Sequence, residues 1–126
     1  MTAGRLLVVD DNEMNRDMLS RRLERQGHAV TMAENGRQAL ERIRAEPFDL
    51  VLLDIMMPEL NGYEVLEQLK NDGDLRHIPV IMISAGQKIR DEGFEAGAFA
   101  FIAKPFAIKE LMDVLGKALE FRNAIK

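Results

Sequence analysis

Three aspartates stand directly after apolar runs, where they could hold a metal ion and accept a phosphoryl group. Asp10 and Asp11 follow the apolar run 6–9, and Asp54 follows the run 50–53. Carboxylates brought together repel one another unless protons or a cation offset their charge, and Mg²⁺ is the oxygen-binding ion that suits carboxylates and phosphate. A carboxylate beside Mg²⁺ can attack a phosphoryl group and form an aspartyl phosphate, because the metal withdraws charge from the phosphoryl oxygens.

Two further residues complete a set that could accept a phosphoryl group. Ser84 closes the apolar run 80–83, and Lys104 closes the run 99–103. A lysine ammonium offers positive charge to the phosphoryl oxygens, and a serine hydroxyl offers them a hydrogen bond. With the three carboxylates, these residues predict a phosphoryl-acceptor site.

The rest of the chain predicts strands that alternate with helices. Short apolar runs typical of buried strands occupy residues 6–9, 29–32, 50–53, 80–83 and 99–103. Helical segments are predicted after these runs, around residues 13–26, 39–43, 63–69, 88–96 and 108–119. Five such units predict a parallel sheet with helices on both faces, because each right-handed crossover helix packs back on the sheet.

This arrangement would bring the candidate residues together. Parallel strands end at one edge of the sheet, and open doubly wound sheets bind ligands in the crevice outside the carboxyl ends of their strands. The three aspartates, Ser84 and Lys104 each stand at the end of a predicted strand. We therefore expect these five residues to converge at one edge of the sheet.

Composition excludes several other kinds of site. The chain has 126 residues, a net charge of −4, two His and no Cys. Without Cys there is no disulfide scaffold, thiol catalysis or Cys-based metal site, and the two His are too far apart in sequence to suggest a cluster. The acidic balance argues against direct nucleic-acid binding, and no apolar run approaches the length of a membrane span. The default expectation is a single cytoplasmic domain without a nucleic-acid or membrane partner.

Four segments resemble the receiver domain of bacterial two-component response regulators, of which the chemotaxis regulator is a single-domain form. They read VVDDNE, LLDIMMPELNGYE, IPVIMISAG and EAGAFAFIAKPF. Each segment alone is a weak signal, whereas all four in this order and spacing are specific. The resemblance covers the whole chain, so a receiver domain is expected over residues 1–126.

The resemblance implies an α/β fold and a signalling function. The fold would be a five-stranded parallel doubly wound sheet, flavodoxin-like with strand order 2-1-3-4-5, and five helices. The domain would accept a phosphoryl group from a histidine kinase or a histidine phosphotransfer protein onto Asp54. It would catalyse only its own phosphoryl transfer and autodephosphorylation, and its changed output face would act on a downstream effector that the sequence does not identify.

The resemblance also assigns roles at the metal. Asp11 and Asp54 would ligate Mg²⁺ directly together with the backbone carbonyl of Met56, and Asp10 would hold the ion largely through water. Taken singly, Asp10 and Asp11 could instead cap the helix that follows them. Their combination with Asp54 at a matching strand end favours the metal site.

The resemblance assigns the phosphate contacts and the switch to the last two strands. Ser84, the backbone amide of Ala85 and the Lys104 ammonium would contact the phosphoryl group. Phe101 matches the aromatic residue that turns inward once the residue at the Ser84 position moves onto the phosphate. An aromatic residue on a strand is equally well explained as part of the core.

Two other functions of the same fold class are alternatives. A haloacid-dehalogenase-like aspartyl-phosphate phosphatase would share the Asp nucleophile, but it normally has a second Asp two residues later, where Met56 stands. A flavodoxin-like flavin carrier would need a hydroxyl-rich phosphate loop after the first strand. Asp10 and Asp11 at that place would repel the flavin phosphate.

Two expectations concern residues outside the predicted site. Met14, Met18, Leu19 and Leu23 predict the core face of the first helix, which leaves Arg16 off that face. His28 and His77 are expected at the surface, because neither belongs to the acidic edge.

Overall fold

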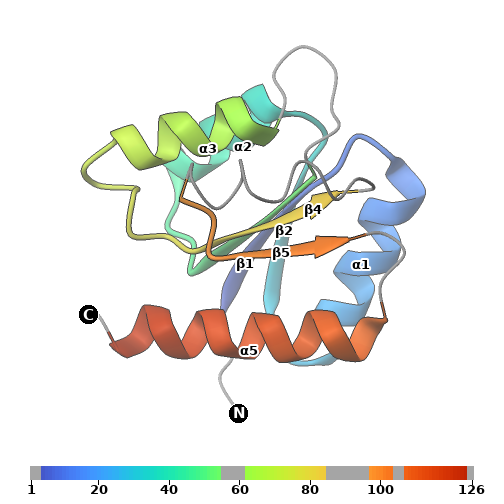
Figure 1. Ribbon diagram of the computed structural model, residues 1–126. Helices are drawn as coiled ribbons and strands as arrows, with labels where there is room; N and C mark the ends of the chain where they lie inside the picture. The colour runs from blue at the N-terminus through green and yellow to red at the C-terminus, as the bar shows by residue number, and fades with distance from the viewer. Residues whose placement is uncertain (1–3, 55–61, 85–96, 104–106, 125–126) are drawn as a thin grey trace.

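The computed structural model of the protein describes residues 4–54, 62–84, 97–103 and 107–124. Five parallel strands form one sheet in the order β2-β1-β3-β4-β5, which confirms the predicted topology. The strands are β1 (Arg5–Val9), β2 (Ala29–Ala33), β3 (Leu50–Asp54), β4 (Val80–Ser84) and β5 (Ala100–Ala103). Figure 1 shows the sheet between two layers of helices.

Four helices lie within the described part of the chain. They are α1 (Glu13–Arg25), α2 (Gly36–Ala45), α3 (Gly62–Asn71) and α5 (Ile108–Ala124). The further helix predicted around residues 88–96 lies outside the described residues. Among the described helices, none combines the length and the apolar character that a bilayer crossing would require.

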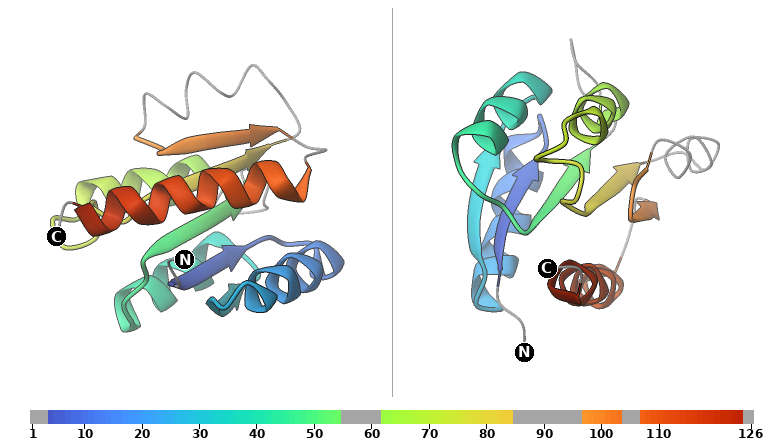
Figure 2. Two further views of the ribbon diagram at one scale, coloured as in Figure 1. Left: turned by 90° about the horizontal axis from the view of Figure 1, so that it is seen from below. Right: turned by 90° about the vertical axis from the view of Figure 1, so that its left-hand side faces the viewer.

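Side chains of alternate strand residues enter two separate cores, one on each face of the sheet. On β1, Leu7 and Val9 pack with the core under α2 and α3, whereas Leu6 and Val8 pack with the core under α1 and α5. Successive side chains of a strand point to opposite faces, so an unbroken apolar run fills both cores. The end-on view in Figure 2 shows α2 and α3 on one side of the sheet and α5 on the other. The double covering buries the central strand β3 along its whole length, whereas the edge strand β2 stays partly exposed.

The buried face of α1 differs from the predicted face. Met14 and Met18 are exposed by 81% and 55%, whereas Arg16, Leu19, Ser20 and Leu23 are buried. The prediction grouped Met14 and Met18 with Leu19 and Leu23, but the buried positions follow the spacing 16, 19, 20 and 23. These four positions form one stripe of an α-helix, and Met14 and Met18 lie on the opposite face.

The expectation of a surface location is confirmed for His77 and wrong for His28. His28 is 8% exposed, and its Nδ1 accepts a hydrogen bond from the backbone N–H of Gly4 at 3.1 Å. The imidazole lies in the turn between α1 and β2, where it lines a pocket with Met112 and Leu115 of α5. Burial of the imidazole lowers the pKa of His28 below its ordinary value of 6.5. Since Nδ1 is an acceptor here, the neutral form of the ring fits the structure.

Acidification is expected to destabilise the fold through His28. Because the folded-state pKa lies below 6.5, the unfolded chain takes up the proton first, and stability falls as the pH drops through 6.5. Urea denaturation between about pH 7.5 and 5.5 measures this loss. The His28→Gln variant should show a flatter pH dependence, and the exposed His77→Gln variant should behave as the wild type does. An unchanged slope in His28→Gln would contradict the role of this imidazole.

Two glycines are expected to respond in opposite directions to alanine substitution. Gly27 follows α1 with a φ of +96°, whereas Gly116 lies within α5 with open space around an added Cβ atom. Gly116→Ala should stabilise the protein by about 0.5–1 kcal/mol, because alanine loses less backbone entropy in a helix. Gly27→Ala should destabilise it by about 1 kcal/mol, because L-residues are strained at positive φ. Denaturant titrations of both variants measure these changes, and the same sign for both would contradict the prediction.

Candidate functional site

The register of β1 and β3 places the carboxylates at the same height of the sheet. Val9 pairs with Leu53, and the next residues are Asp10, directly after β1, and Asp54, the last residue of β3. One carboxylate oxygen from each of Asp10, Asp11 and Asp54 lies within 4.8 Å of the other two. Asp10 and Asp54 are buried, whereas Asp11 is exposed. The predicted convergence of these three aspartates is confirmed.

Local hydrogen bonds hold the turn that carries Asp10 and Asp11. The Asp10 N–H donates to the Ala33 carbonyl at 3.2 Å, and Oδ1 of Asp10 accepts from the Asn12 N–H at 2.9 Å. The side chain of Asn12 accepts from the Asn15 N–H at 2.9 Å and so caps α1. Because Asn12 is the helix N-cap, the capping role considered for Asp10 and Asp11 belongs to their neighbour.

The donor set of this cluster is made of carboxylate oxygens alone. Such donors suit Mg²⁺ and other hard divalent cations, whereas softer metals prefer imidazole or thiolate. Three carboxylates so close together also gain from a cation that offsets their repulsion. The residues present therefore fit Mg²⁺, with Asp11 on the solvent side and two buried carboxylates behind it.

The other predicted ligand and phosphate-contact residues lie at the end of β4 or follow β3, β4 or β5 in the sequence. Asp54 pairs with Ile83, so the backbone of Ser84 comes one residue further along the neighbouring strand. Ser84 in turn pairs with Ala103, which Lys104 follows in the sequence. Met56, Ala85 and Lys104 lie outside the described residues. The strand register agrees with a site in which Ser84 lies at the same edge as Asp54.

Phe101 lies on β5 with its side chain in the core on the α3 face. It is 8% exposed and pairs in register with Met82 of β4. Both residues belong to the same buried cluster. The structure thus shows the inward, core position that the sequence left open, in the strand that leads to Lys104.

Sequence reasoning missed Arg16 as a residue of the site. Arg16 is 9% exposed, and its Nη1 donates to the backbone carbonyl oxygen of Asp10 at 2.8 Å. The spacing of Arg16 to Leu19, Ser20 and Leu23 could have placed it on the buried face of α1. The two exposed methionines Met14 and Met18, which lie on the opposite face of α1, obscured this signal.

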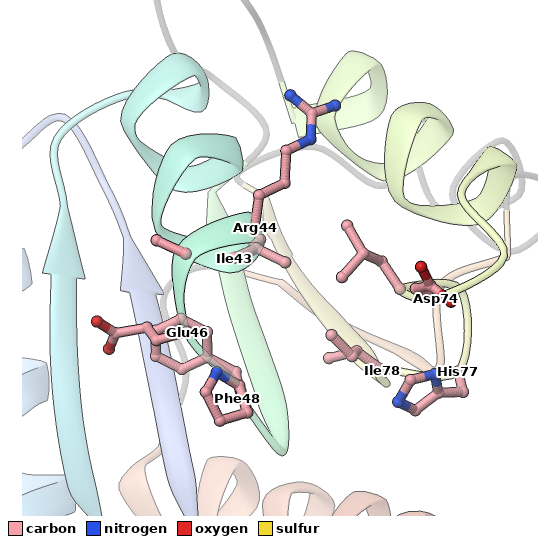
Figure 3. A pocket seen from close by; sticks show the side chains of 10 residues that line it. Ile43, Arg44, Glu46, Phe48, Asp74, His77 and Ile78 are labelled. Carbon is pink, nitrogen blue, oxygen red and sulfur yellow. The ribbon is translucent and has the colours of Figure 1, made fainter.

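A separate cavity of about 310 Å³ lies at the opposite edge of the sheet, between the end of α2 and residues 74–78 (Figure 3). Phe48 and Ile78, which precede β3 and β4, line it and are buried. Glu46 at the cavity is engaged with Arg5, whose Nη2 lies 3.3 Å from Oε1 of Glu46. None of the residues that the sequence analysis assigned to the phosphoryl-acceptor site lines this cavity.

Comparison with known proteins identifies the family. A family model described as the response regulator receiver domain matches residues 6–116. The chain belongs to this receiver family. The match runs from within β1 to the middle of α5 and includes every residue that the sequence analysis assigned to the site.

Individual relatives agree with this assignment. The response regulator MprA of Mycolicibacterium vanbaalenii is 41% identical over 110 residues, which cover 86% of this chain and 47% of that protein. MprA of Mycobacterium ulcerans is 40% identical over the same shares of both chains. The receiver chain thus spans about half the length of these relatives.

Solved structures share the fold. The chemotaxis protein CheY4 of Vibrio cholerae superposes with a TM-score of 0.87 at 28% identity, covering 94% of this chain and all of CheY4. A putative response regulator from Chloroflexus aurantiacus gives a TM-score of 0.90 at 29% identity, over 94% of this chain and 99% of the other. The comparisons give the phosphatase alternative no support.

Proposed function

We propose that this receiver domain is a phosphorylation-controlled switch in which Asp54 accepts a phosphoryl group in a Mg²⁺-dependent reaction. The observation that carries the proposal is the convergence of Asp10, Asp11 and Asp54 within 4.8 Å at the carboxyl edge of the sheet, in a chain of the receiver family. Asp54 ends β3 between the two neighbouring strands β1 and β4. It is thus the carboxylate carried by the central strand of the sheet.

In this proposal Asp11 and Asp54 bind Mg²⁺ directly with the Met56 carbonyl, and Asp10 binds it largely through water. The bound ion would offset the carboxylate repulsion and draw charge from the phosphoryl oxygens. One contact supports the indirect role of Asp10: its Oδ1 already accepts a hydrogen bond from the Asn12 N–H. That bond uses part of the acceptor capacity of Asp10 and leaves it less suited to direct ligation.

Ser84, the Ala85 amide and Lys104 would bind the phosphoryl oxygens. Movement of Ser84 toward the phosphate would act on β5, because Ser84 and Ala103 are paired in the sheet. Phe101 lies two residues earlier on β5 and is packed in the core. The proposed switch therefore couples Ser84 to Phe101 by packing, since Phe has no hydroxyl group. The same site would hydrolyse its own acyl phosphate.

The proposed donor is the phosphohistidine of a histidine kinase or of a histidine phosphotransfer protein. Met14 and Met18 expose apolar surface on α1, the helix that begins two residues after Asp11. Together with Arg21 and Arg22 on the same helix, both exposed, they form a surface on which such a partner could dock. The domain is proposed to extend over residues 1–126, and a downstream effector would recognise its changed output face.

Incubation with acetyl phosphate and Mg²⁺ tests the phosphoryl-acceptor function without a kinase. The wild type should gain about 80 Da, the mass of one phosphoryl group, when followed by intact-protein mass spectrometry. Omission of Mg²⁺ should prevent the gain, because the carboxylate cluster then lacks its counter-charge. No adduct on the folded wild type under any of these conditions would argue for a receiver that only binds partners.

A further inference from the structure

Arg16 is a buried cation that connects three segments around the carboxylate cluster. It is 9% exposed, and its Nη1 donates to the Asp10 carbonyl oxygen at 2.8 Å in a buried hydrogen bond. Its Nη2 lies 3.8 Å from Oε1 of Glu34. One guanidinium thus joins α1, the turn after β1 and the turn after β2.

Packing alone does not explain a charged residue at this position. The neighbouring buried positions Leu19 and Leu23 on the same face of α1 are apolar and belong to the core. Burying a guanidinium is costly unless it is paired and hydrogen-bonded. The Glu34 side chain is 63% exposed, so that ion pair is a weak one. The buried bond to the Asp10 carbonyl is therefore the contact that most needs a guanidinium.

The bond from Arg16 adds to two other hydrogen bonds that hold Asp10 in place. The Asp10 N–H is bound to the Ala33 carbonyl, and its carboxylate accepts from the Asn12 N–H. Arg16 donates a hydrogen bond to the carbonyl oxygen of Asp10, which belongs to the peptide group that joins Asp10 to Asp11. The orientation of that peptide group sets the direction in which Asp11 leaves the turn.

We propose that Arg16 is a positioning residue that holds the Asp10–Asp11 turn in the geometry required for divalent-cation binding. The inference rests on the proposed Mg²⁺ site and adds a residue outside the ligand set. Loss of an outer partner of a metal ligand typically weakens metal binding by about 10–100-fold. Arg16 meets that description, because it contacts a ligand residue and none of the proposed ligand atoms.

The sign of the effect separates positioning from simple charge. A cation beside three carboxylates repels Mg²⁺, so its removal would strengthen Mg²⁺ binding if charge were its only contribution. Loss of positioning has the opposite effect, because the carboxylates must then be ordered when the ion binds. Our proposal therefore requires weaker binding in a variant that removes a positive charge.

Isothermal titration calorimetry of Mg²⁺ into the folded proteins tests this sign. Arg16→Met is expected to raise the Kd about tenfold, while Arg25→Met, which removes the same charge from an exposed position of α1, should stay within about twofold of the wild type. An unchanged or lower Kd for Arg16→Met would overturn the inference. Wild-type protein that does not bind Mg²⁺ would overturn the proposed metal site as well, so the two failures are distinguishable.

Arg16→Lys keeps the charge and provides a second variant if Arg16→Met does not fold. Lysine lacks the planar fork that lets Arg16 reach Asp10 and Glu34 together, so the Kd should again rise by several fold. Wild-type affinity in Arg16→Lys would show that the guanidinium geometry is not required, which would also overturn the inference.

Discussion

Replacing Asp54 with Asn is expected to stabilise the metal-free protein and to abolish the further stabilisation that Mg²⁺ gives to the wild type. Two unit charges 4–5 Å apart repel by about 3–4 kcal/mol at an effective dielectric constant of about 20. Asp54 is buried beside two other carboxylates, so its neutralisation removes such repulsion. Part of the gain is offset because Asn has fewer acceptor sites, which leaves an expected net stabilisation of about 1–2 kcal/mol.

The stabilisation that Mg²⁺ gives to the wild type follows from the thermodynamic linkage between ligand binding and folding. A ligand that binds only the folded state stabilises it by about 1.4 kcal/mol when its free concentration is about ten times Kd. Thermal unfolding of the wild type should therefore shift upward with Mg²⁺, and that of Asp54→Asn should not. Asp113→Asn on the exposed surface of α5 makes the same charge change and should retain the wild-type Mg²⁺ response. An equal Mg²⁺ shift in Asp54→Asn would show that this carboxylate is not a ligand.

Leu52→Ala is expected to cost about 2–5 kcal/mol of stability, enough to unfold a marginal domain. Leu52 is 1% exposed on β3, the central strand, in the core between the sheet and the helices α1 and α5. The truncation would remove packing from the core that includes side chains of both helices and leave a cavity that the neighbouring strands cannot fill, because both are paired along β3.

Met14→Ala provides the matched comparison for this core substitution. Met14 is an apolar residue at 81% exposure, so its truncation should change the free energy of unfolding by less than about 0.5 kcal/mol. Denaturant titrations of both variants measure the contrast. A loss of unfolding free energy in Leu52→Ala as small as that in Met14→Ala would contradict the burial of Leu52 in the core under α1 and α5.

The fold class could be predicted because the central strands are buried on both faces. Runs such as residues 50–53 are apolar without a break, which is typical of a parallel sheet covered by helices. The strand order was implied by the family resemblance and not by the runs themselves. The buried face of α1 could not be predicted correctly, because Met14 and Met18 are as hydrophobic as core residues although they lie on the exposed side of the helix.

The carboxylate site could be predicted because its position depends only on where strands end. Asp10 directly follows β1, and Asp54 is the last residue of β3. Because these two strands are neighbours, the sheet topology brings the two carboxylates together. Arg16 and His28 were not predicted in their structural roles, because each contacts a backbone atom, the Asp10 carbonyl and the Gly4 N–H respectively. Every residue carries such backbone groups, so these partnerships leave no pattern in the sequence.

Phosphotransfer from autophosphorylated histidine kinases to the wild type and to Asp54→Asn tests the central claim most directly. At least one kinase in a panel should transfer its phosphoryl group to the wild type at an early time point, when the other kinases have transferred none. Asp54→Asn should receive none, since an amide cannot form the acyl phosphate. Transfer that persists on Asp54→Asn would contradict the assignment of Asp54 as the phosphoryl acceptor.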